Sequence, residues 1–184
     1  MPMADARAVR LLSLCSAAAA LGGMVVVAAA WRRRAAQIDA LLRFWFDGTT
    51  AELYASRWFV PAGSAALAAL DQTIAKRYGA LLAEAETGRL EGWVQHGPRG
   101  LLALIILLDQ FSRHVHRGDQ HAVQRTDERA LSLAQQMLAR GWNHRLSATE
   151  LVFALMPMRH SPTVERLEQV RRPSPAWASK RCAA

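Results

Sequence analysis

The stretch Leu101-Leu-Ala-Leu-Ile-Ile-Leu-Leu-Asp-Gln-Phe-Ser-Arg-His-Val-His-Arg-Gly118 decides the fold of this chain. Its first eight residues are all apolar, and a dense group of ionisable side chains follows them directly. A helix that is apolar on every face belongs inside a core, and polar groups at its end lie at the edge of that core. The stretch therefore predicts a buried helix through Phe111, with a candidate functional site beside its end.

The segments on both sides of this stretch also have the apolar spacing of helices. That spacing extends over residues 35–47, 64–87, 124–140 and 148–156. We expect Ser64 and Ser147 to cap two of these helices, Gly141 to end a third, and residues 58–63 to form a loop with aromatic anchors. No stretch alternates with period two for long enough to form a sheet. The sequence therefore predicts an all-α domain over residues 35–170, built from antiparallel helix pairs joined by short turns.

The net charge of +8 comes from the two ends of the chain. Basic and acidic side chains balance over residues 35–158, and the positive excess is divided between residues 1–34 and 159–184. A balanced body offers no basic surface to phosphates, so nucleic acid is not an expected partner. Cys15 and Cys182 belong to no C-x-x-C motif, which argues against a disulfide framework or a thiolate metal site. Residues 171–184 are expected to form an irregular basic tail.

Residues 1–34 form a leader with an uncharged, apolar window from Leu11 to Trp31. Its length suits a bilayer span, and Trp31 beside Arg32-Arg-Arg34 suits an interfacial anchor. The sequence therefore predicts an N-terminal apolar helix that anchors the chain as a single-pass membrane protein, with the helical domain in the cytoplasm. Three alternatives stay open: a cleaved signal peptide ending at Ala28-Ala-Ala30, an organellar transit peptide, and a soluble cytoplasmic protein with a mis-set start codon.

The ionisable group after the buried helix is the candidate site. With one residue from near the chain end, it comprises Asp109, Gln110, Arg113, His114, His116, Arg117 and His160. Asp109 and Arg113 are four residues apart and can pair on one helix face, so we expect a structural ion pair. The alternative is a site for a small anion, because guanidinium groups recognise planar anions through two parallel hydrogen bonds.

The histidines give little support for a metal site. His114 and His116 are two residues apart, so on a helix they point in different directions and share no metal ion. A metal site would need a further ligand from Asp119, His121 or His160, and no known ligand spacing is matched, so no metal and no cofactor are expected. His96 and His144 lie in turn-like contexts and are expected to be solvated loop residues.

Several short motifs occur in an order that resembles a known family. They are Phe44-Trp-Phe-Asp-Gly48, Arg77-Tyr-Gly79, Gly88-Arg-Leu90, Trp93, Pro98-Arg-Gly100, Leu107-Leu-Asp-Gln-Phe111, Arg113, Arg117-Gly118, Asp127, Ala130-Leu131, Met156-Pro157 and His160-Ser161. Over about residues 38–170 the chain resembles the family called domain of unknown function 924 (DUF924). The resemblance implies a fold similar to the tetratricopeptide-like all-helical superfamily. It also implies a truncated C-terminus, because the family continues with further helices where residues 171–184 do not match.

No biochemical activity is attached to that family, so the function must be argued from the residues. We expect a helical module that binds an unidentified protein or a small anionic ligand, and we expect no enzymatic activity. The alternative is a hydrolase-type enzyme whose polar site is formed by Asp109, Arg113, His114 and His116.

Overall fold

A computed structural model describes residues 6–160, with side chains from residue 24 onward. Within residues 6–160 every element is a helix, which confirms the all-α prediction. The elements are α1 (Ala6–Phe46), α2 (Thr50–Leu53), η1 (Tyr54–Trp58), α3 (Ala65–Glu86), η2 (Glu91–His96), α4 (Gly97–Ile105), η3 (Ile106–Phe111), α5 (Ser112–Val115), α6 (Gln120–Ala139), η4 (Trp142–Arg145) and α7 (Ala148–His160). The tetratricopeptide-like arrangement stays a prediction, and the expected tail and truncated end lie outside the described residues.

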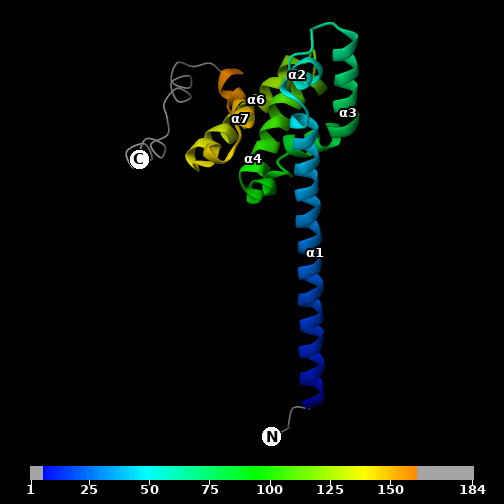
Figure 1. Cartoon of the computed structure of the whole chain (residues 1–184). Coiled ribbons are helices and arrows are strands. Elements are labelled where there is room, and N and C mark those ends of the chain that lie inside the picture. Colours follow the sequence, from blue (N-terminus) through cyan, green and yellow to red (C-terminus); the bar gives the residue numbers. More distant parts are fainter. Residues whose placement is uncertain (1–5, 161–184) are drawn as a thin grey trace, which may run out of the picture.

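Helix α1 joins the leader and the first helix of the domain into one element (Figure 1). It does not break at residue 34, and its N-terminal part extends away from the other helices. Ile38, Leu41 and Trp45 near its C-terminal end are buried, whereas Met24 to Val27 are 65–69% exposed. No helix in the described part of the chain is both long and apolar enough to cross a bilayer, so the single-pass span predicted for Leu11 to Trp31 is not supported.

The predicted central helix runs through α4, η3 and α5, and its residues from Leu101 to Leu108 are all buried. It starts as expected, with Pro98 in its first turn. Gly100 allows the close approach of η2, because a Cβ there would lie 1.9 Å from the carbonyl oxygen of Trp93. The sequence predicted an ordinary helix up to Phe111, but η3 is a π-helix. Directly after this wider turn, the Ser112 hydroxyl donates to the Leu108 carbonyl at 2.6 Å.

Three predicted helix ends agree with the structure, whereas α6 begins at Gln120, four residues before its predicted start. The Ser64 hydroxyl accepts a hydrogen bond from the Leu67 amide, and the Ser147 hydroxyl accepts one from the Glu150 amide. Gly141 ends α6 in the left-handed conformation that glycine adopts without strain. Three expectations were wrong: Trp58 ends the π-helix η1 instead of lying in a loop, and His96 and His144 both lie in short helices, η2 and η4. The His96 ring is also stacked on the Trp31 ring, with 3.7 Å between the ring centroids.

The core forms around the π-helix η3, which packs against α3, α6 and α7. An aromatic cluster joins these elements to α1. The Phe111 ring centroid lies 4.8 Å from that of Tyr78 in α3 and 5.4 Å from that of Trp45 in α1. Aromatic pairs at this separation contribute roughly 0.5–1.5 kcal/mol each beyond their buried area. Packing of η3 on three helices places the residues after Leu108 at the junctions between those helices.

Candidate functional site

The polar residues of the central helix do not form one site. They divide into three ionic groups, each linking the central helix to other helices of the fold. The first group joins Asp109 and Arg113 to α6 and α7, and the other two join His114, His116 and Arg117 to α3. Neighbouring residues on the helix point toward different partners, and His116 and Arg117 lie just beyond its end at Val115.

Asp109 is the central residue of the first group and is fully buried, with no exposed side-chain surface. Its Oδ1 accepts a hydrogen bond from Nδ1 of His160 at 2.7 Å. Its Oδ2 accepts one from the side-chain Nε2 of Gln110. The expected pair with Arg113 is present but long, at 3.7 Å. Arg113 pairs more closely with Asp127 of α6, at 2.7 Å. Burial raises the pKa of Asp127, although Arg113 opposes that shift.

The second group consists of His114 and Arg117 on Asp71 of α3. Nδ1 of His114 donates to Oδ1 of Asp71 at 2.7 Å, and Arg117 donates to both carboxylate oxygens, at 2.5 and 2.9 Å. Burial lowers the pKa of His114, more than the Asp71 carboxylate raises it. Burial also tends to raise the pKa of Asp71, but the hydrogen bonds from Arg117 and His114 outweigh it and hold that pKa below its usual range. The folded protein therefore favours neutral His114 beside charged Asp71.

The third group is a single pair, in which Nε2 of His116 lies 2.6 Å from Oε1 of Glu86. His114 and His116 thus have different carboxylate partners. Among the described side chains, no three His, Cys, Asp or Glu residues are grouped to hold a metal ion. The alternative of a metal site has no support in that part of the chain.

An open cavity of about 430 Å³ adjoins these groups. Its walls carry both signs of charge, from Arg113, His116, Arg117, Asp119 and Asp127. Its remaining lining residues are Gly118, Gln120, Val123 and Gln124. The arginines and the histidine in this wall already have carboxylate partners. The other predicted site residues, Asp109, Gln110, His114 and His160, do not line this cavity.

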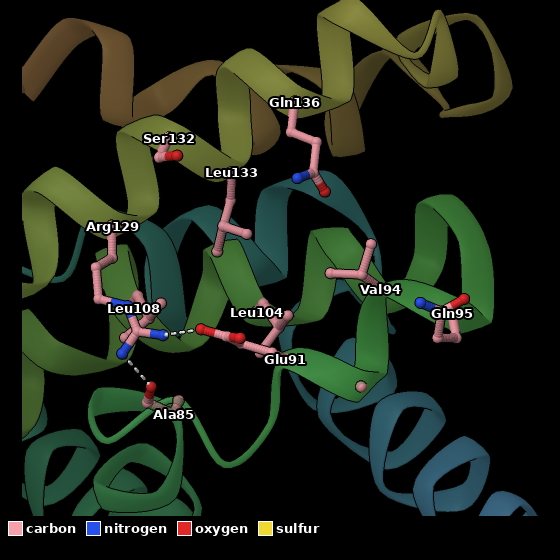
Figure 2. Close-up of a pocket in the computed structure, with 11 residues that line it drawn as sticks. Ala85, Glu91, Val94, Gln95, Leu104, Leu108, Arg129, Ser132, Leu133 and Gln136 are labelled. Carbon is pink, nitrogen blue, oxygen red and sulfur yellow. Dashed lines mark hydrogen bonds and ion pairs between the residues drawn. The ribbon is translucent and has the colours of Figure 1, made fainter.

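A larger cavity, of about 560 Å³, lies between η2, the central helix and α6 (Figure 2). Leu104, Leu108, Leu133 and Val94 give it apolar walls, and Figure 2 shows Leu133 and Gln136 pointing from α6 toward Val94 and Leu104. Its other lining residues are Ala85, Glu91, Gly92, Gln95, Arg129 and Ser132. None of these residues was predicted to belong to a site, because they come from separate elements and carry no motif for a site.

Two polar side chains of α6 give this larger cavity its chemistry. Arg129 donates to the carbonyl oxygens of Ala85 and Glu86 at the end of α3, at 2.8 and 2.7 Å, and to Glu91 at 3.1 Å. The Arg129 guanidinium group therefore caps the C-terminal end of α3 and forms an ion pair with Glu91 of η2. The buried amide oxygen of Gln136 has no hydrogen-bond partner among the described residues. A buried acceptor without a partner costs roughly 1–3 kcal/mol, so a donor supplied by a bound molecule would stabilise it.

Comparison with known proteins gives a family but no activity. The sequence profile described as "Bacterial protein of unknown function (DUF924)" matches residues 41–181. A solved structure titled as a protein of unknown function, ATU0120 from Agrobacterium tumefaciens, is similar with a TM-score of 0.62 and 27% sequence identity. The similarity covers 73% of this chain and 70% of that one. No curated protein matches the chain. Because the profile matches most of the sequence, this chain belongs to the DUF924 family, as its motifs indicated.

Proposed function

We propose that this protein is a small-ligand-binding module, and that its ligand is an uncharged, amphipathic molecule held in the cavity between η2 and α6. The cavity's volume of about 560 Å³ lies in the range of ligand pockets, roughly 300–1,000 Å³. A cavity between neighbouring helices also suits the tetratricopeptide-like arrangement that the family resemblance implies. The observation that carries the proposal is the amide oxygen of Gln136, which has no partner among the described residues and lies beside an apolar wall.

The charges around the cavity support a neutral ligand. Among the described lining residues only Arg129 and Glu91 are charged, and they pair with each other. The leucines of the wall favour an apolar surface, while Gln136, Gln95 and Ser132 can form hydrogen bonds that orient a polar group. A ligand with one hydrogen-bond donor and an apolar ring or chain would satisfy both parts of the wall.

The proposal can be tested with a library of neutral fragments, screened by saturation-transfer NMR and by thermal shift. Gln136→Leu should abolish fragment binding, because it removes the free acceptor and leaves an apolar side chain of similar size. Gln135→Leu is the matched control, since Gln135 is the preceding residue of α6 and is exposed. Equal binding by both variants, or no fragment bound by the wild type, would show that this cavity is not the ligand site.

A hydrolase is the second candidate, favoured by the contact between Asp109 and His160. A buried carboxylate that accepts from Nδ1 fixes the imidazole orientation and leaves Nε2 as a base for a substrate or water molecule. The His160 side chain is partly exposed, at 29%. The same contact also serves to fasten α7 to the central helix, and for this reason ligand binding comes first.

The enzymatic candidate predicts hydrolysis of simple aryl esters or phosphate esters that depends on His160. His160→Gln should abolish turnover while leaving the protein folded. His121→Gln, which changes an exposed histidine of α6, should leave turnover unchanged. Absence of hydrolysis by the wild-type protein over such a panel would rule out this candidate without affecting the binding proposal.

A further inference from the structure

A third cavity lies where α1 ends, beside η1 and α3. Its volume is about 340 Å³, and it is lined by Ala40, Arg43, Phe44, Asp47, Arg57 and Arg77. It shares no residue with either cavity described above. Three elements of the fold supply one arginine each, so tertiary structure and not local sequence brings them together.

The three arginines differ from those of the central helix in their lack of a carboxylate partner within the described part of the chain. Among those residues, no carboxylate oxygen of Asp or Glu lies within 4.0 Å of a side-chain nitrogen of Arg43, Arg57 or Arg77. Asp47 is the one acidic residue among the described lining residues, so together they carry a net charge of two positive. Like charges that face one cavity repel each other unless an anion lies between them.

Two of the guanidinium groups are also held in place. The Arg57 and Arg77 guanidinium carbons lie 5.1 and 4.9 Å from the centroid of the Phe44 ring. Arg57 donates to the backbone carbonyl of Asp47 at 3.0 Å. Stacking on a ring holds a guanidinium group with its edge nitrogens available. A ligand would therefore meet groups that have already lost part of their freedom, which lowers the entropic cost of binding.

We infer that this cavity is a binding site for a doubly charged tetrahedral oxyanion, namely phosphate or the phosphate group of a small monoester. The net charge of the wall matches a dianion. Arginines from three elements can contact several oxygens of one tetrahedral group, whereas a planar carboxylate is satisfied by a single guanidinium fork. The inference does not depend on the ligand proposed for the cavity between η2 and α6.

The test is isothermal titration of the full chain with inorganic phosphate and with glycerol 3-phosphate, at constant ionic strength. We expect saturable binding with one site per chain. Arg43→Gln and Arg77→Gln should each weaken it about tenfold or more, because each removes a charge-assisted hydrogen-bond donor. Since a phosphate monoester loses its second proton near pH 6, glycerol 3-phosphate should bind more tightly at pH 7.5 than at pH 5, and sulfate should show no such change.

Arg140→Gln is the matched control, because Arg140 also stacks on an aromatic ring, Trp142 at 4.7 Å, but does not line this cavity. It should bind phosphate as the wild type does. Three results would overturn the inference: no saturable binding of phosphate, equal weakening by Arg140→Gln, or malonate bound more tightly than phosphate. Thermal melts of the variants show that each one is folded before its binding is compared.

Discussion

Two groups of arginines, one at the end of the central helix and one around the end of α1, differ in whether they have carboxylate partners. Arg113 and Arg117 each contact a carboxylate of another helix within 2.7 Å, whereas the arginines around Phe44 contact none among the described residues. A paired arginine fixes the relative positions of two helices. An unpaired group of arginines leaves its charge for a ligand. The motif richest in charge is thus the better candidate for structure, and the less conspicuous group is the better candidate for binding.

The largest expected effect on stability comes from the group of paired side chains around Asp109. Asp109→Ala should destabilise the protein by roughly 3–5 kcal/mol, because it removes a fully buried carboxylate from several polar partners. Chemical denaturation would measure the change, with Glu128→Ala on the exposed face of α6 as a control of small effect. Adding Arg113→Ala should increase the loss, since Asp127 then loses its partner as well. Recovery of stability in that double variant would instead mean that Asp109 and Arg113 form a closed pair.

A smaller loss is expected at Asp71. Asp71→Ala should cost roughly 1–3 kcal/mol, because hydrogen bonds from Arg117 and His114 to a charged acceptor are lost. Glu84→Ala in the same helix serves as the control, because the Glu84 side chain has no partner among the described contacts. A double-mutant cycle with Arg117→Ala would separate the free energy contributed by the ion pair between Asp71 and Arg117 from that contributed by His114. A coupling energy near zero would contradict a structural role for this group.

The pH dependence gives a weaker but more specific signal. Burial holds the pKa of His114 below its ordinary value, so the unfolded chain binds this proton at a higher pH than the folded one. Stability should therefore fall as the pH drops below about 6.5. His114→Gln should flatten this slope in thermal melts, whereas His121→Gln should keep it. His96, whose pKa burial also lowers, contributes equally to both variants. A slope unchanged by His114→Gln would assign the effect to other groups.

The smallest effect on stability is expected for the arginines around the end of α1, which have no carboxylate partner among the described residues. Arg77→Gln without phosphate should change the free energy of unfolding by no more than about 0.5 kcal/mol, because a lost stacking contact is offset by reduced repulsion among the arginines. With saturating phosphate, the wild type should gain thermal stability that the variant does not gain. Identical stabilisation of both proteins by phosphate would remove the distinction between the two groups of arginines.

Local chemistry made most of the helices predictable. The caps at Ser64 and Ser147 and the stop at Gly141 depend only on nearby residues, and all three agree with the structure. The π-helix η3 was not predictable, because it depends on how the central helix packs against three others. The partners of Arg113 and His114 come from α6 and α3, so the sequence could indicate a polar group but not its division. The cavity beside Gln136 had no signal in the sequence, since its residues are unremarkable in isolation.

The π-helical segment gives the central stretch a way to change its length by one residue without changing its contacts. Leu107, Leu108 and Asp109 are buried one after another, at positions that turn through wide angles around the helix axis. A π-helical turn holds about one residue more than an α-helical turn. Loss of a single residue here, with a return to an α-helix, would therefore leave Arg113, His114 and Arg117 facing the same neighbours. Comparisons between relatives should treat a gap of one residue in this stretch as a change of helix type that keeps the partners.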